Sequence, residues 1–194
     1  MQIKKPVLLM FVSFALIISS GCTRDSGEDT SDAATKTLTI TCSVCREDRE
    51  LPVKHAFDQV DAGENVSLPL NWTGGTDEVE SYLVLMTDEH EIADDFVHWL
   101  VVDIPASVTE LAEGASGTDQ MPADSRELTN DFGLPGYGGP WPPAGSGKHV
   151  YRITVYGLRV PTVSLTGQFT KAEVLEEIKD TIIISGSVTG YFEL

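Results

Sequence analysis

The sequence predicts a single, mostly β domain with one helix near its C-terminal end. Two apolar runs, residues 81–87 (SYLVLMT) and 97–104 (VHWLVVDI), are typical of strands that are buried on both faces. Residues 149–158 (HVYRITVYGL) alternate instead, which is typical of a strand with two different faces. Residues 171–180 (KAEVLEEIKD) space their apolar side chains as a helix does.

Shorter elements complete this outline. Thr170 is placed as the N-cap of the helix and Glu173 as its capping-box partner. The polar segment 110–130 is punctuated by glycine and proline and is expected to be a loop. Further strands are expected at 37–42, within 51–72, at 181–184 and at 188–194. With 194 residues, 41% of them hydrophobic, the chain is long enough for one domain with a full core.

The N-terminus has the pattern of an export signal. Lys4 and Lys5 precede an apolar run at 7–18 that is too short to span a bilayer comfortably. Small residues then lead into Cys22, as in bacterial-type lipoprotein signals, which are cleaved before a cysteine that carries lipid on its sulfur. We therefore expect a signal peptide at 1–21 and lipidation of Cys22. An ordinary secretory signal is the alternative, and both predict export to the cell envelope.

Residues 22–36 are small, polar and acidic, and are expected to form a disordered tether between a membrane anchor and the domain at 37–194. The formal net charge is −17, and removal of residues 1–21, which hold two lysines and no acid, changes it to −19. So acidic a surface argues against nucleic acid as a partner. A negatively charged ligand would need a shielded pocket.

Cys42 and Cys45 form a CxxC sequence, and in an exported protein a local disulfide is the first expectation. A redox pair would open a helix after a strand, and a zinc site would need two further ligands. Neither context is evident here, but both alternatives remain open.

Several polar side chains fall at predicted strand ends. Asp88 and His90 follow the first apolar strand, His98 begins the second, and His149 and Tyr151 follow a loop rich in glycine and proline at 130–147. Prolines fix φ and glycines allow close approach, so this loop is expected to be stiff and to deliver His149 and Tyr151 to one end of a sheet. Imidazole and phenol groups beside glycine N–H groups can bind phosphate or carboxylate oxygens.

The segments NVSLPLNW, SYLVLMTD, VHWLVVDIP and NDFGLPGYGGPWPPAGSGKHVY, in this order, resemble the phosphatidylethanolamine-binding protein family. The similarity extends over residues 51–194 and is greatest to the bacterial and archaeal branch, often called Raf-kinase-inhibitor-like proteins. It implies two packed β-sheets with a helix near the C-terminus, and a pocket for phosphate, acetate or a phosphorylethanolamine-like head group. The pocket residues implied here are Asp88, His98, Pro142, Pro143, His149 and Tyr151.

The chain departs from the family pattern at two places. The family's Asp-Pro-Asp-x-Pro turn is replaced at 88–92 by DEHEI, which retains Asp88, loses both prolines and introduces His90. The family's His-Arg-Tyr is replaced by His149-Val150-Tyr151, which removes a positive charge on the face opposite the pocket. His90 is expected to be exposed rather than functional.

These features lead to a non-catalytic binding protein, without cofactor or bound metal, as the first hypothesis. A protease inhibitor or other protein-interaction module is the alternative, and its partner is unknown. A hydrolase that uses His98 or His149 with Asp88 ranks lower, because the sequence has no GxSxG elbow and Ser146 lies in a flexible Gly-Ser-Gly setting. A metal site made by Asp88, His90, His98 and His149 is also weighed, and the spacing of these residues argues against it.

Overall fold

The architecture is that of a computed structural model, which describes residues 37–47 and 49–194. The predicted signal peptide, the lipidation site Cys22 and the tether at 22–36 lie outside the described residues. In the described part, no helix is long and apolar enough to cross a membrane.

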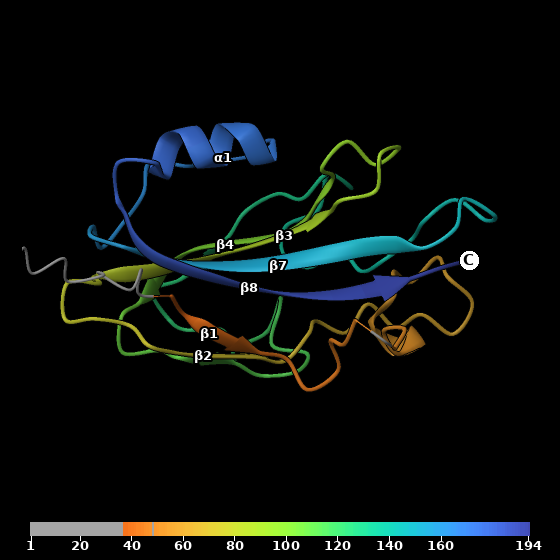
Figure 1. Cartoon of the computed structure of the whole chain (residues 1–194), viewed down its shortest axis with the longest axis horizontal. Helices are drawn as coiled ribbons and strands as arrows, with labels where there is room; N and C mark the ends of the chain where they lie inside the picture. Colours follow the sequence, from red (N-terminus) through yellow and green to blue (C-terminus); the bar gives the residue numbers. More distant parts are fainter. Residues whose placement is uncertain (1–36, 48) are drawn as a thin grey trace, which may run out of the picture. The chain divides into compact units, whose positions relative to one another are not determined.

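Two antiparallel sheets make up the domain (Figure 1). The small sheet has the order β1-β2-β5 and contains β1 (Thr39–Thr41), β2 (Leu70–Thr73) and β5 (Glu110–Leu111). The large sheet has the order β6-β4-β3-β7-β8 and contains β6 (Arg126–Glu127), β4 (Val97–Pro105), β3 (Ser81–Asp88), β7 (His149–Leu158) and β8 (Ile182–Phe192). The 3₁₀ helix η1 (Val53–His55) and the helix α1 (Lys171–Ile178) complete it.

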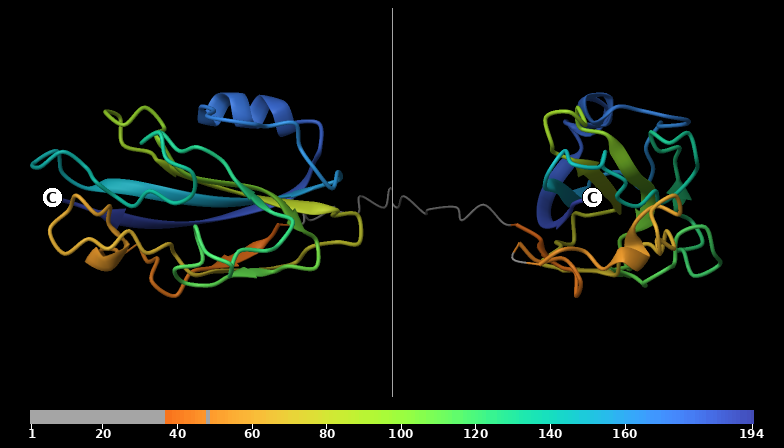
Figure 2. Two further views of the ribbon diagram at one scale, coloured as in Figure 1. Left: turned by 180° about the vertical axis from the view of Figure 1, so that it is seen from behind. Right: turned by 90° about the vertical axis from the view of Figure 1, so that its right-hand side faces the viewer.

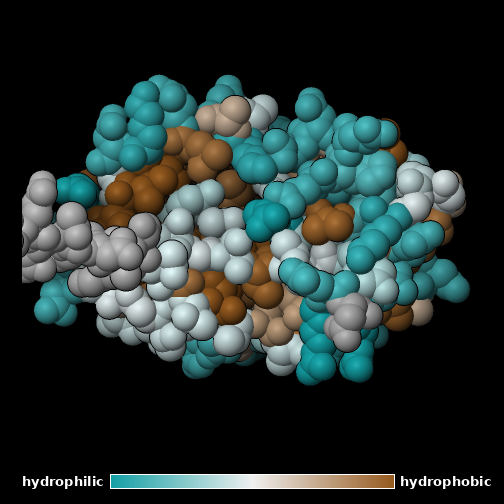
Figure 3. Space-filling view, viewed as in Figure 1, coloured by the Kyte–Doolittle hydropathy of each residue, from teal (hydrophilic) through white to brown (hydrophobic). Residues whose placement is uncertain are grey.

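The large sheet is the middle of three layers, with α1 on one side and the small sheet on the other (Figures 1 and 2). One apolar cluster fills the space between the sheets, and a second lies between the large sheet and α1. In the space-filling view, hydrophobic atoms lie directly beneath the polar outer surface of α1 (Figure 3). β3 is therefore covered on both faces, which explains why all eight of its residues are buried.

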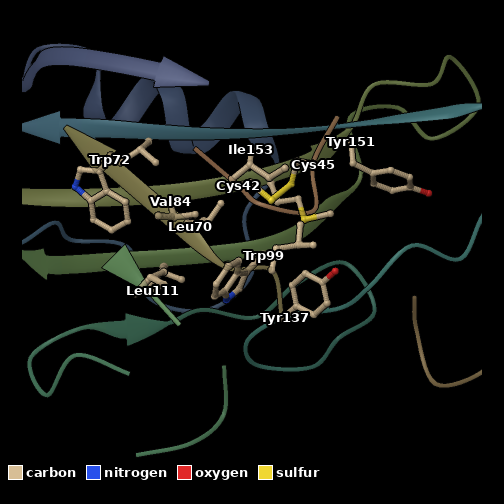
Figure 4. Close-up of a cluster of buried hydrophobic side chains, with 14 of the residues drawn as sticks. Cys42, Cys45, Leu70, Trp72, Val84, Trp99, Leu111, Tyr137, Tyr151 and Ile153 are labelled. Atoms are coloured by element: carbon tan, nitrogen blue, oxygen red, sulfur yellow. A yellow bond between two sulfur atoms is a disulfide. The ribbon is translucent and has the colours of Figure 1, made fainter. Parts of the chain in front are cut away.

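The cluster between the sheets is built around large side chains, including Trp72 and Trp99 (Figure 4). Tyr151 lies at one end of this cluster, with its hydroxyl directed away from it. Cys42 and Cys45, whose sulfur atoms form a disulfide, belong to the same cluster. The disulfide closes a tight loop in the segment after β1, and burial of both cysteines packs this loop against the core.

The main sequence predictions are confirmed. The family fold, the two central strands and the alternation of β7 are all observed, and α1 begins with a reciprocal capping box between Thr170 and Glu173.

Three predictions were wrong in detail. The segment 110–130 is not entirely loop, because it contains β5 and β6, two-residue strands that are too short to show a pattern. Within 51–72 the structure forms η1 and β2, with no other strand there.

The third error concerns the C-terminal end, where two predicted strands are one continuous strand, β8. The sequence Ser185-Gly186-Ser187 has the composition of a turn. In the structure, a Cβ atom at Gly186 would lie 2.1 Å from the Leu38 carbonyl oxygen. Gly186 therefore marks a close approach between two chain segments rather than a reversal of direction.

Candidate functional site

The polar residues predicted at strand ends meet at one end of the large sheet. Asp88 is the last residue of β3 and pairs with Tyr151 in the antiparallel register, while His149 is the first residue of β7. Since β4 also pairs with β3, His98 near its start lies at this same end.

A β-bulge directs His98 into the site. Met86 pairs with Trp99, whereas Thr87 pairs with Val97, so His98 is an extra residue opposite the junction between two residues of β3. β-Bulges are common next to functional sites, where they change the direction in which a side chain points. The sequence run at 97–104 carries no sign of this irregularity.

The glycine-rich loop is fixed to His98 through its backbone. The Gly138 N–H donates to the His98 carbonyl at 2.8 Å, and His98 Nδ1 donates to the Gly138 carbonyl at 2.7 Å. Gly139 N–H donates to the Asn65 side-chain oxygen at 2.7 Å. The loop therefore has a defined shape, as its composition predicts.

His98 is fully buried, and this burial lowers the pKa of its imidazole below the ordinary value. The hydrogen bond to Gly138 and the nearby Asp88 oppose that shift but do not cancel it. With Nδ1 used as a donor, the neutral ring retains Nε2 as an acceptor. His98 thus offers a lone pair, not a positive charge.

His149 and Asp88 form a buried pair. His149 Nδ1 donates to Asp88 Oδ2 at 2.6 Å, and both side chains are at least 95% buried. On its other side, His149 Nε2 lies 2.9 Å from Ser146 Oγ. The Ser146 hydroxyl donates to the Pro143 carbonyl at 2.6 Å, so it accepts from Nε2. His149 is therefore held at both ring nitrogens, by Asp88 on one side and by Ser146 on the other.

His90 stacks on His149, with ring centroids 3.9 Å apart and planes at 14°. Its backbone N–H donates to Asp88 Oδ1 at 2.9 Å. His90 is half-buried rather than exposed, so the prediction for this residue was wrong. Loss of the family's turn prolines is accompanied by a ring that covers one face of His149.

The Tyr151 hydroxyl is buried beside the Asp88 carboxylate, but no described residue meets the geometry of a hydrogen bond to it. Burial raises the pKa of Tyr151 far above its ordinary value, and the Asp88 carboxylate acts in the same direction. Buried polar groups are nearly always paired, so an unpaired hydroxyl at the edge of a cavity indicates a place for a ligand atom or water.

A cavity of about 210 Å³ lies at this end of the sheet. All six predicted site residues line it: Asp88, His98, Pro142, Pro143, His149 and Tyr151. The rest of its wall is apolar and was not singled out from the sequence: Ile92, Ala93, Phe96, Phe132 and Trp141. Phe132 and Trp141 could have been singled out as aromatic residues of the glycine-rich loop, whereas Ile92, Ala93 and Phe96 carry no such signal.

The aromatic wall is continuous. Phe132 stacks on Phe57 at 4.3 Å between centroids and meets Phe96 edge-on at 4.8 Å. Trp141 stacks on Phe57, and its side chain remains 47% exposed. Ile92, which also lines the cavity, is 57% exposed. The cavity is therefore polar at the strand ends and apolar near the solvent.

The described residues hold no group of three or more His, Cys, Asp and Glu side chains arranged to bind a metal ion. The weighed set of Asp88, His90, His98 and His149 thus does not converge as ligands. Two of its members are instead engaged in a hydrogen-bonded pair and two in ring stacking or backbone contact.

Comparison with known proteins agrees with the fold. The sequence profile of the family described as phosphatidylethanolamine-binding protein matches residues 41–193. The chain belongs to this family. It is 30% identical over 193 residues to the UPF0098 protein PH1269 of Pyrococcus horikoshii, covering 98% of this chain and 91% of that protein.

Other members lie in the bacterial branch of the family. The Mycobacterium tuberculosis protein named "Putative lipoprotein LppC" is 31% identical over 160 residues, covering 82% of this chain and 74% of the relative. The crystal structure of Escherichia coli YbcL, titled a new member of the mammalian PEBP family, superposes with a TM-score of 0.74 at 27% identity, covering 81% of this chain and 98% of YbcL.

Proposed function

We propose that this family member is an exported, lipid-anchored and non-catalytic binding protein whose cavity holds a small anion or a phosphorylated head group. The observation that carries the proposal is the convergence of all six predicted residues on one cavity beside the unpaired Tyr151 hydroxyl. The N-terminal sequence pattern and the name of the mycobacterial relative support the anchor.

The hydrogen-bond donors and acceptors that line the cavity restrict the kinds of anion that it can bind. Tyr151 offers a hydroxyl donor, while the neutral His98 offers an acceptor at Nε2. The ligand that fits both is an anion that still carries one proton, such as a phosphate monoester in its singly charged form. His149 adds a second donor if the ligand oxygen takes the place of Ser146 at Nε2.

A titration tests this function. Phosphate and phosphorylethanolamine are added to residues 37–194, which contain the whole described core, while the histidine ring signals are followed by NMR. We expect saturable shifts of His98 and His149 together, and no shift of His55. Absence of a response in both rings at millimolar ligand would contradict the proposal.

A hydrolase is the second candidate, because Ser146, His149 and Asp88 are hydrogen-bonded in the order found in serine hydrolases. The Ser146 hydroxyl is directed to Pro143, however, and Ser146 does not line the cavity. The variant Ser146→Ala separates the two functions. A binding protein retains or gains affinity, because His149 Nε2 is released, whereas a serine hydrolase loses all turnover of an ester substrate.

A further inference from the structure

A second hollow lies on the other side of β7 from the cavity. It is an open groove of about 710 Å³ at the edge of the large sheet. Its floor comes from the outward faces of β7 and β8, including Val150, Arg152 and Thr189, and its wall from residues 45–47. Nothing in the binding function proposed above uses it.

The groove follows a free strand edge. β8 is the last strand of its sheet and lies in front in Figure 1. The carbonyl of Ser185 accepts from Leu38 N–H at 3.0 Å, and that of Tyr191 from Leu51 N–H at 2.8 Å, so both point away from β7.

Backbone groups alternate in direction along a strand, so the N–H and C=O groups of Ser187 and Thr189 point to this edge as well. No described strand pairs with them there. A short gap is therefore left between the two places where other segments close the edge of β8.

The groove is also basic, although the whole chain carries a formal charge of −17. Arg46, Lys148 and Arg152 line it, against one acidic residue, Glu47. The Lys148 ammonium lies 3.9 Å from the Tyr191 ring centroid, and Arg152 is held by Glu89 through bonds of 2.5 and 3.0 Å. Among described residues, neither Arg46 nor Lys148 forms an ion pair with a carboxylate.

We propose that this groove binds an extended acidic peptide segment of a partner protein, which adds as a strand along Ser187 and Thr189. Free edge groups supply the backbone hydrogen bonds of such strand addition. Arg46 and Lys148 supply charge complementarity to carboxylates placed at every second residue of the segment.

The test uses the full chain and a short blocked peptide that alternates threonine and glutamate. We expect saturable NMR shifts at the amides of Ser187 and Thr189, together with their protection from hydrogen exchange. Affinity should fall as salt rises. A peptide with lysine in place of glutamate, and an acidic peptide N-methylated at alternate residues, should both bind at least about tenfold more weakly, since each loses one class of contact.

Variants locate the site. Arg46→Glu combined with Lys148→Glu should abolish binding, whereas Lys171→Glu combined with Lys179→Glu, a double charge reversal at the two ends of α1 and outside the groove, should leave it unchanged. Ser187→Pro removes an N–H that faces the free edge, a position where strands tolerate proline, and should also abolish binding.

Equal affinity for the N-methylated peptide would overturn strand addition, and equal affinity for the lysine peptide would overturn the role of charge. Adsorption of the chain to anionic phospholipid vesicles with no response to the acidic peptide would assign the groove to a membrane surface instead.

Discussion

At the scale of single residues, Tyr151 and Tyr137 form a natural pair for comparison. Both are buried, but the Tyr137 hydroxyl donates to the His55 carbonyl at 2.9 Å, whereas the Tyr151 hydroxyl is unpaired. Tyr151→Phe should therefore leave the free energy of unfolding unchanged or raise it, and should weaken phosphorylethanolamine binding by about 1 kcal/mol, or roughly fivefold.

Tyr137→Phe should do the reverse, with a loss of about 1 kcal/mol in stability and no direct effect on binding. Urea unfolding and calorimetric titration of both variants check the pair. A Tyr151→Phe variant with unaltered affinity would remove the hydroxyl from the site.

The protonation state of His98 predicts how binding depends on pH. Because burial lowers its pKa, His98 is neutral near pH 7 and the bound anion must bring a proton or the ring must take one up. Affinity should therefore rise as pH falls from about 8 to 6, by at most about tenfold per pH unit for one proton. Titration with a phosphate monoester at several pH values measures this slope.

The variant His98→Gln serves as the control, and a sulfate monoester, which carries no proton near neutral pH, separates the two proton sources. A dependence that persists with sulfate and disappears in His98→Gln assigns the proton to the ring. Flat binding of the phosphate monoester across this range would contradict the acceptor role of His98.

At the scale of elements, the glycine-rich loop depends on contact with η1. A Cβ atom at Gly139 would lie 2.1 Å from the His55 carbonyl oxygen and 2.6 Å from the Ala56 carbonyl carbon, both of them backbone atoms that cannot rotate away. Gly139→Ala should separate the loop from η1, destabilise the domain by about 2–4 kcal/mol and weaken ligand binding with it.

Gly117→Ala is the matched substitution, because a Cβ atom there meets nothing within 4 Å and its cost comes only from a positive φ of 73°. It should cost about 1 kcal/mol and leave binding intact. Thermal unfolding of both variants distinguishes a steric contact from backbone conformation.

The strands and loops also show which structural features could be predicted from the sequence and which could not. Apolar runs and alternation predicted β3, β4 and β7, because these strands have faces of constant environment. The bulge at His98, the stack of His90 on His149 and the bond from Ser146 to His149 depend on register and loop shape. Such contacts depend on the three-dimensional arrangement of the chain and leave no pattern in the local sequence, so they could be identified only in the structure.

At the scale of the whole molecule, two buried histidines predict a response to acid. Burial lowers the pKa of both His55 and His98 below the ordinary value of 6.5. Unfolding exposes them, and the unfolded chain then binds more protons, so stability is fully present above about pH 6.5 and decreases as pH falls below it toward the folded-state pKa values.

The urea midpoint should therefore fall between pH 7 and pH 5, and the fall should be smaller in His55→Gln, which removes one of the two groups. A midpoint that rises on acidification would show that repulsion among the many carboxylates dominates instead, because acid relieves that repulsion.

The position at which the described chain begins has a topographic consequence. Leu38 is bonded to Ser185, whereas the cavity lies beside the His149–Phe192 pair at the other end of β8. Phe192 lies seven residues after Ser185 along the strand, a distance of roughly 23 Å at 3.3 Å per residue. The N-terminal end of the described domain and the entrance to the cavity therefore lie at opposite ends of the same edge strand, so a partner or a chain segment at one of them does not obstruct the other.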